Sequence, residues 1–204
     1  MKNDIFKIGN IEDIEHLKWI EEETEEVFNT PIFNIVKSLR VSKKGVRAPF
    51  VTLLSPNWVT IIPWYRNEQN IPCFVMVQQY RHGSKSIIRE FPAGMVDKGE
   101  EALTAAKREL IEETGIESKN IKHLSTLNPN PAFMNNEANF FLATNISKTS
   151  VQHLDTTELL DVLSVPVSEV IEKLGNSPLY DNGIMMIALG LFLKEAVINP
   201  DLIK

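Results

Sequence analysis

Three glutamates in a short segment could together bind a divalent cation. Glu109, Glu112 and Glu113 fall on one arc of a helix, which turns by about 100° per residue. Like charges three or four residues apart repel each other, and carboxylates in a last helical turn oppose the helix dipole. A hard cation relieves both effects, and Mg²⁺ takes carboxylate oxygens while keeping waters for substrate phosphates. The cluster therefore indicates phosphate chemistry, with a solvated acidic helix face as the alternative.

The residues around this cluster suit the same chemistry. Arg108 lies four residues before Glu112 and can ion-pair with it, or reach back toward Glu100. In either case it would hold a carboxylate in place beside a metal. Gly94 and Gly99 allow the backbone to turn tightly between a strand and the helix.

The segment Gly94–Ile116 resembles the Nudix box. Its order is Gly, five residues, Glu, seven residues, then Arg-Glu-aliphatic-x-Glu-Glu-x-Gly-aliphatic, and every fixed position is met. Upstream, residues 77–81 (Val-Gln-Gln-Tyr-Arg) and 90–94 (Glu-Phe-Pro-Ala-Gly) resemble the ADP-ribose and nucleoside diphosphate sugar pyrophosphatase branch. Pro131 also stands about sixteen residues after the last glycine of the box, where that branch has a proline.

The resemblance implies a metal site. Mg²⁺ is the expected ion, with Mn²⁺ as the alternative. Glu109 and Glu113 are the expected metal ligands, and Glu100 and Glu112 are supporting or additional ones. The backbone carbonyl of Ala93 often joins them in the family.

The resemblance also implies substrate contacts. Arg81 is expected to contact a phosphate, and Glu90 to orient Arg81 or the ribose. Four aromatic residues are candidates for stacking on the base, although each also suits a core or an interface; they are Phe33, Phe50, Trp58 and Phe133.

The expected reaction is attack of water on a phosphorus of the diphosphate, with a carboxylate taking the proton. In the ADP-ribose branch this base tends to come from a late loop, which here offers Asp155-Thr-Thr-Glu158. Glu158 is the first candidate, Glu137 the second and Glu112 the third. Threonines stand in that loop where a second acid is expected.

The predicted activity is hydrolysis of ADP-ribose or a related nucleoside diphosphate sugar to a nucleoside monophosphate and a sugar phosphate. The loop Asn130–Asn136 differs from the Ser-Pro-Gly version typical of ADP-ribose hydrolases, so another nucleotide sugar or broad specificity fits as well. The alternatives are a nucleoside triphosphate pyrophosphatase that cleans the nucleotide pool and a non-catalytic nucleotide sensor on the same fold.

The elements that must position these residues follow from periodicity and turn signals. Residues 101–114 contain no glycine or proline and place Leu103, Ala106 and Leu110 on one stripe, so we expect a helix that ends at Gly115. Residues 11–28 carry many acidic side chains and predict a polar helix or a loosely held segment. Residues 145–158 read as a polar loop. Strands are expected at 32–36, 50–54, 59–62, 74–79, 121–127, 138–143 and 159–165, and further helices at 167–174 and 182–196.

These elements predict an α/β fold of the Nudix type, an α/β/α sandwich with a mixed sheet and an N-terminal β extension. Residues 1–57 would form the extension and residues 58–204 the hydrolase domain. Relatives of this branch often use such an extension to form a homodimer, in which the partner completes each site. We therefore expect a homodimer.

The net charge and the composition limit the classes of molecule that this chain is expected to bind. The net charge of −6 and the pI of about 5.3 argue against polymeric nucleic acid or an anionic membrane as a partner. The single cysteine, Cys73, lies in an apolar run, and the N-terminal residues lack the apolar core of a secretory signal. We expect a cytoplasmic protein with a small nucleotide substrate.

Overall fold

A computed structural model describes residues 14–204, which form two compact units. Within the described residues, the N-terminal unit comprises residues 14–55 together with Asn130–Asn135. The C-terminal unit comprises Pro56–Pro129 and Asn136–Lys204. The expectations for residues 1–13, including the absence of a secretory signal, lie outside the described residues.

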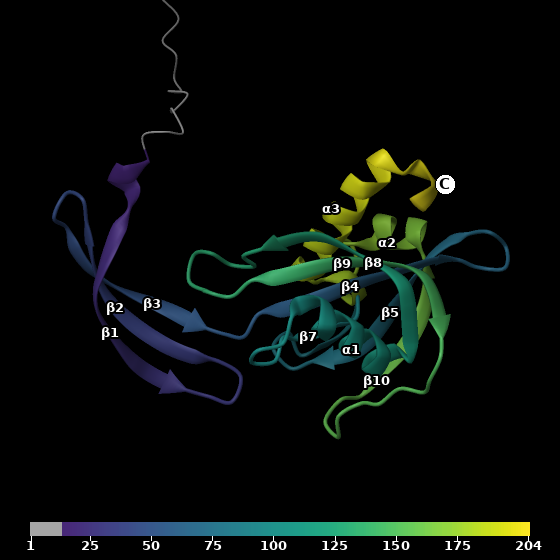
Figure 1. Cartoon of the computed structure of the whole chain (residues 1–204), viewed down its shortest axis with the longest axis horizontal. Helices are drawn as coiled ribbons and strands as arrows, with labels where there is room; N and C mark the ends of the chain where they lie inside the picture. The colour runs from purple at the N-terminus through teal and green to yellow at the C-terminus, as the bar shows by residue number, and fades with distance from the viewer. Residues whose placement is uncertain (1–13) are drawn as a thin grey trace, which may run out of the picture. The chain divides into compact units, whose positions relative to one another are not determined.

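The N-terminal unit is built on an antiparallel sheet of three strands in the order β1-β2-β3 (Figure 1). A short 3₁₀ helix, η1 (Glu15–Leu17), precedes β1 (Trp19–Asn29), β2 (Asn34–Ser42) and β3 (Arg47–Leu54). The strands expected at 32–36 and 50–54 overlap β2 and β3, which pair with each other as an antiparallel hairpin.

The prediction of a polar helix or loose segment over residues 11–28 is wrong for β1. This strand pairs along its length with β2, and its acidic side chains meet basic ones across the pair, as Glu21 meets Arg40 and Glu25 meets Lys37. Pairing with a partner strand outweighs the local preference for a helix.

The C-terminal unit contains a mixed sheet of seven strands. The main path runs β10-β5-β4-β9-β8, with β6 paired to β5 and β7 paired to β4. β4 and β9 run parallel, and the other pairs are antiparallel. The strands are β4 (Trp58–Arg66), β5 (Pro72–Arg81), β6 (Ser86–Glu90), β7 (Ala93–Met95), β8 (Ile116–Leu127), β9 (Ala138–Lys148) and β10 (Leu160–Pro166).

Helices cover both faces of this sheet, which confirms the predicted mixed sheet between helices. They are α1 (Ala102–Thr114), α2 (Val167–Lys173), η2 (Pro178–Tyr180), α3 (Gly183–Ile198) and η3 (Pro200–Leu202). Alternate residues of the central strands face opposite layers, so that Phe141 packs with α1 and Phe140 and Leu142 pack with α2 and α3. No helix between residues 14 and 204 is long and apolar enough to cross a membrane.

Two further local predictions need correction. β9 continues to Lys148, so residues 145–148 are strand and only the remainder of 145–158 is loop. Leu103 is 42% exposed and does not face the core. The buried face of α1 is instead centred on Ala105, Ala106 and Leu110, because small side chains let the helix lie close to the sheet.

Candidate active site

The glutamates of α1 are buried to different extents, because the helix turns its Ala105, Ala106 and Leu110 face toward the sheet. The side chain of Glu109 is 13% exposed and that of Glu112 is 42% exposed. Glu113 is 4% exposed and counts among the buried residues of the helix. Glu109 and Glu113 therefore do not lie on a solvated face, and burial makes their charged forms costly.

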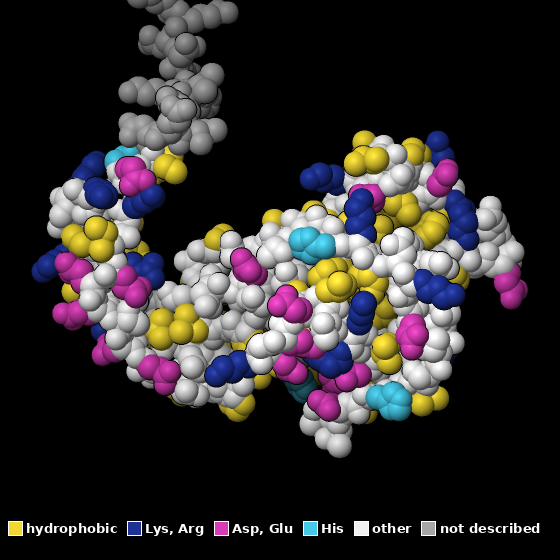
Figure 2. Space-filling view, in the orientation of Figure 1, with side chains coloured by type: hydrophobic (Ala, Val, Ile, Leu, Met, Phe, Trp, Pro, Cys, Tyr) yellow, Lys and Arg dark blue, Asp and Glu magenta, His cyan; other side chains and the backbone are white. Residues whose placement is uncertain are grey.

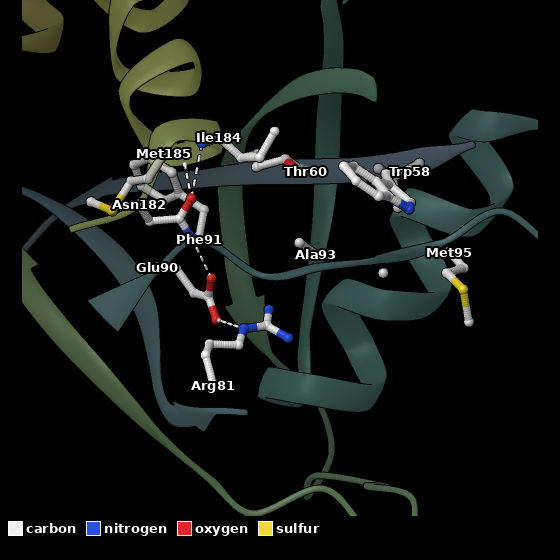
Figure 3. Close-up of a pocket in the computed structure, with 12 residues that line it drawn as sticks. Trp58, Thr60, Arg81, Glu90, Phe91, Ala93, Met95, Asn182, Ile184 and Met185 are labelled. Atoms are coloured by element: carbon white, nitrogen blue, oxygen red, sulfur yellow. Dashed lines mark hydrogen bonds and ion pairs between the residues drawn. The ribbon is translucent and has the colours of Figure 1, made fainter. Parts of the chain in front are cut away.

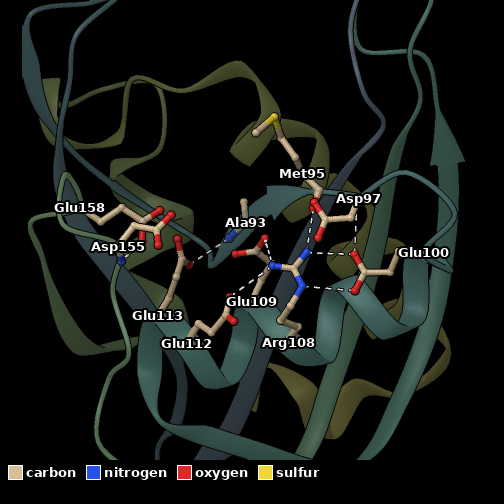
Figure 4. A network of polar contacts seen from close by, with 10 residues as sticks. All are labelled: Ala93, Met95, Asp97, Glu100, Arg108, Glu109, Glu112, Glu113, Asp155 and Glu158. Atoms are coloured by element: carbon tan, nitrogen blue, oxygen red, sulfur yellow. Dashed lines mark hydrogen bonds and ion pairs between the residues drawn. The ribbon is translucent and has the colours of Figure 1, made fainter. Parts of the chain in front are cut away.

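Arg108 lies at the centre of the acidic cluster and binds three carboxylates (Figure 4). Its Nη2 and Nε donate to the two oxygens of Glu100 at 3.0 and 3.2 Å, and Nη1 donates to Glu109 at 2.7 Å and to Glu112 at 3.2 Å. Nη2 also donates to the Met95 carbonyl at 3.0 Å. The bonds to Arg108 lower the pKa of Glu100, and that to Glu100 contributes most to a raised pKa of Arg108. Both alternatives for Arg108 predicted from the sequence occur together.

Glu113 has no ion-pair partner among residues 14–204. One of its oxygens accepts a hydrogen bond from the backbone N–H of Ala93 at 3.1 Å. Burial raises the pKa of Glu113 to about 8, and the charges of Glu109, Glu158 and Glu90 add to this effect. Burial also raises the pKa of Glu109, although Arg108 opposes that shift.

Gly94 permits the backbone of β7 to touch the carboxylate of Glu109. A Cβ atom at this position would lie 2.1 Å from both Cδ and Oε1 of Glu109, far inside any contact distance. At the other end of α1, Gly115 ends the helix with a left-handed φ of 69°. The two glycines of the sequence motif thus fix the helix end and its approach to β7.

The chemistry of these side chains fits a divalent cation. Burial disfavours the charged forms of Glu109 and Glu113, and a bound cation would favour those charged forms. Both oxygens of Glu100 are already bound by Arg108, which makes Glu100 less available than Glu113. Among residues 14–204, no three His, Cys, Asp or Glu side chains converge into a complete metal cage.

The candidate bases lie in different surroundings. Glu158 is exposed in the loop before β10; its backbone N–H donates to the Asp155 carbonyl, and its carboxylate accepts from the Asp155 backbone N–H at 3.1 Å. Figure 4 shows both acids beside Glu113, and the Glu158 charge acts on Glu109 and Glu113. Glu137 is exposed next to β9, and its side chain makes no hydrogen bond or ion pair in the described part of the chain.

A cavity of about 370 Å³ lies beside β7 (Figure 3). Ala93 and Gly94, which contact Glu113 and Glu109, are also part of its wall. Its lining is Trp58, Val59, Thr60, Arg81, Glu90, Phe91, Ala93, Gly94, Met95, Asn182, Ile184 and Met185.

The predicted substrate residues are divided between the units. Arg81 and Glu90 line the cavity as a pair, since Arg81 Nε donates to Glu90 Oε1 at 2.6 Å. Of the aromatic candidates, Trp58 lines the cavity, whereas Phe133 belongs to the N-terminal unit and is about half exposed there. Phe33 and Phe50 also belong to that unit.

Sequence reasoning missed the contribution of α3. Asn182, Ile184 and Met185, at the start of this helix, form part of the cavity wall about ninety residues beyond Glu90. An asparagine before an apolar run is a recognisable N-cap signal. Nothing local, however, says that the helix would begin next to β6 and β7.

Comparison with known proteins identifies the arrangement. The chain is 29% identical to the methanol dehydrogenase activator of Bacillus methanolicus, over 85% of this chain and 92% of that protein. It is 32% identical to an ADP-ribose pyrophosphatase of Bacillus subtilis, over 60% of this chain and 67% of that protein. The crystal structure of an ADP compounds hydrolase has a similar fold, with a TM-score of 0.78 at 23% identity over 89% of this chain and 96% of that one. Residues 56–182 match the NUDIX domain. Because this match spans more than half of the sequence and includes the whole acidic helix, the chain belongs to the Nudix hydrolase family.

Proposed function

We propose that this chain hydrolyses the diphosphate bond of ADP-ribose or a related nucleoside diphosphate sugar, giving a nucleoside monophosphate and a sugar phosphate. The branch-like segments around Arg81 and Glu90 and the relative named ADP-ribose pyrophosphatase support this substrate class. Nudix enzymes generally use a divalent metal ion. Mg²⁺ is the ion we propose, with Mn²⁺ as the alternative.

The observation that carries the proposal is the shared strand β7. One side of Ala93 and Gly94 contacts the buried carboxylates, and the same residues line the cavity. A volume of about 370 Å³ is within the usual range for small-molecule sites. A diphosphate lying along β7 would therefore reach both the acidic cluster and a partly apolar cavity that can hold the attached organic group.

The main residues that would hold the metal are the buried carboxylates of α1 whose pKa values burial raises. Glu109 and Glu113 are the main ligands in this proposal, with Ala93, Glu100 and Glu112 as additional ones. The bound ion would supply charge neutralisation of the phosphate oxygens and activation of water. Arg108 keeps Glu109 and Glu100 oriented, because it bonds to both while remaining tied to the Met95 carbonyl.

Glu158 is the base that we propose. It is exposed, so water can reach its carboxylate, and it lies beside Glu113 in Figure 4. Its loop is held by the Asp155–Glu158 turn, which keeps the carboxylate near the cluster. Glu112 stays a third candidate, although one of its oxygens is bound by Arg108. Glu137 stays the second.

A panel of nucleotides tests the function. Phosphate release should be followed with Mg²⁺ and a coupled phosphatase for ADP-ribose, ADP-glucose, GDP-mannose, UDP-glucose, NADH and nucleoside triphosphates. Preferential cleavage of ADP-ribose or a nucleotide sugar would support the proposal. Preference for triphosphates would replace it with nucleotide-pool cleaning, and binding without turnover would indicate a sensor.

A second candidate rests on the Bacillus methanolicus relative, which is named as a dehydrogenase activator and aligns over most of both chains. In this reading the chain would increase the rate of a methanol dehydrogenase. Adding the chain with Mg²⁺ to a methanol dehydrogenase assay tests it, with a Glu113→Gln variant as the control for hydrolytic activity. A rate unaffected by the intact chain would exclude this role for the dehydrogenase used.

We also propose a cytoplasmic homodimer formed through the N-terminal unit. Large apolar side chains are exposed on its strands, among them Ile20, Val27, Phe28 and Val51. Figure 2 shows such side chains at the surface of this unit between acidic ones. Light scattering should give a mass near twice the 23.1 kDa of one chain, and Val51→Lys should lower it. A mass of one chain for the unaltered protein would refute the dimer.

A further inference from the structure

Asn182 connects the start of α3 to the charged wall of the cavity. Its Oδ1 accepts hydrogen bonds from the backbone N–H groups of Ile184 at 2.9 Å and Met185 at 3.3 Å, so it is the N-cap of the helix. Its Nδ2 donates to Glu90 Oε2 at 2.6 Å. One amide side chain thus serves two elements that are far apart in the sequence.

Glu90 connects Asn182 to Arg81 through hydrogen bonds. Glu90 is only 5% exposed, and its other oxygen accepts the bond from Arg81 Nε at 2.6 Å. Figure 3 shows Asn182, Glu90 and Arg81 in a row along the cavity wall. Within residues 14–204, the terminal amino groups of Arg81 make no hydrogen bond or ion pair, which leaves them available to an anion.

The segment that carries Asn182 is itself held in place. Tyr180, two residues earlier, is buried, and its hydroxyl accepts from Arg89 Nη1 at 3.2 Å and donates to Glu169 at 3.3 Å. Arg89 and Glu90 are neighbours on β6, so two successive residues of this strand bind the chain just before α3. Asn182 therefore approaches Glu90 from a fixed position.

We infer that Asn182 is a positioning residue for substrate binding, acting through Glu90 on the guanidinium of Arg81. Without Nδ2, one oxygen of a buried carboxylate loses its partner, and the carboxylate is free to rotate away from the geometry that holds Arg81. Because Ile184 and Met185 line the same cavity, the cap also sets the apolar wall opposite. The inference rests on the proposed function for the role of Arg81 toward a phosphate.

Substitutions at this position can separate the two tasks of the side chain. Serine and aspartate are good N-caps, but serine is too short to reach Glu90, and ionised aspartate has no donor for it and sets a second negative charge against it. Asn182→Ser and Asn182→Asp should therefore keep the helix and lose the link. Asn182→Ala loses both, and Asn176→Ser, at an exposed asparagine that bonds to a backbone carbonyl, is the matched control.

The first readout does not depend on turnover. The Nε–Hε signal of Arg81, assigned by its loss in Arg81→Lys, should be protected from solvent exchange in the unaltered chain. It should exchange faster in Asn182→Ser and Asn182→Asp but not in Asn176→Ser. Thermal unfolding should show that both variants still fold cooperatively, with a Tm that is lowered by the unpaired Glu90 oxygen and lowered further in Asn182→Asp.

The second readout is kinetic, on whichever substrate the nucleotide panel selects. KM should rise about tenfold in Asn182→Ser and Asn182→Asp, the scale of one weakened charged hydrogen bond, while kcat changes little. In an Arg81→Ala background, Asn182→Ser should add no further effect, since both changes act on one contact.

The outcomes separate this inference from the proposed function. An unchanged Arg81 signal together with an unchanged KM would show that Asn182 is only a helix cap, and the inference would fall. A changed Arg81 signal in a protein that hydrolyses nothing on the panel would support the link and refute the proposed activity. A rise in KM that persists in full in the Arg81→Ala background would also overturn the inference, because Asn182 would then act elsewhere.

Discussion

Replacing Glu113 by glutamine tests whether the fold holds a carboxylate for a cation. Burial raises its pKa from the ordinary 4.5 to about 8 in the absence of metal. Between these two pH values the unfolded chain releases a proton that the folded chain retains. The stability contributed by Glu113 is therefore full below about pH 4.5 and is lost as the pH rises through about 8. Glutamine cannot ionise, so the variant should not show this loss.

The size of the effect follows from the shift. One pKa step corresponds to about 1.4 kcal/mol, so the rise amounts to at most ~5 kcal/mol, and local relaxation reduces it to a few kcal/mol. For a chain of this length 1 kcal/mol moves Tm by about 2–4 °C. In EDTA, the Tm of the unaltered chain should thus fall by roughly 5–10 °C relative to Glu113→Gln between pH 5 and pH 9.

Mg²⁺ should raise the Tm of the unaltered chain more than that of Glu113→Gln. At about 100 times its Kd, a bound ion stabilises a protein by ~2.7 kcal/mol, and only the chain with the intact ligand gains this in full. Hydrolysis by Glu113→Gln should fall by roughly 100-fold or more. Glu117→Gln, an exposed residue of β8, is the control that should change neither profile.

Two results would refute this reasoning. If the Tm difference in EDTA is the same at pH 5 and pH 9, the fold does not penalise the Glu113 charge. If Mg²⁺ raises the Tm of both chains equally, Glu113 is not a metal ligand. The buried amide of glutamine could shift the Tm of the variant by a constant amount. Such a shift does not affect either test, because each test asks how the Tm of one chain changes with pH or with Mg²⁺.

Three further substitutions test the geometry of the site. Gly94→Ala would place Cβ 2.1 Å from the Glu109 carboxylate, so activity should fall at least roughly tenfold while Tm changes little, since the side chain can move away. Gly115→Ala should lower stability by more than about 2 kcal/mol in chemical denaturation, because φ is 69° and the new Cβ would lie 2.2 Å from the Ser150 carbonyl oxygen. Glu158→Gln should reduce kcat by about 10²–10⁴ with unchanged Tm, whereas a kcat near that of the parent chain would move the role of base to Glu137 or Glu112.

The order of residues along the chain was sufficient for the parts of the site that lie on one element. The spacing of Glu109, Glu112 and Glu113 predicts a shared helix arc, and Gly115 predicts the end of α1, because a helix has a fixed rotation per residue. The hairpin β2–β3 and the helix α3 could likewise be predicted from turn residues and an apolar run. These features depend on neighbours within a few residues.

Other features depend on surfaces that meet only in the folded chain. The acidic run of β1 suggests a helix or a loose segment, and only its pairing with β2 makes it a strand. The helical pattern suggests that Leu103 is buried, but α1 packs through Ala105 and Ala106 and leaves Leu103 exposed. The same packing of α1 buries Glu113 and thereby raises its pKa.

The family, the acidic helix and the charged residues could thus be recognised from the order of amino acids. Which charges are desolvated, the contact of Gly94 with Glu109 and the bond of Asn182 to Glu90 could be seen only in the folded chain. Charge and helix periodicity are local properties, whereas desolvation and hydrogen bonding between distant residues arise only when separate elements pack together.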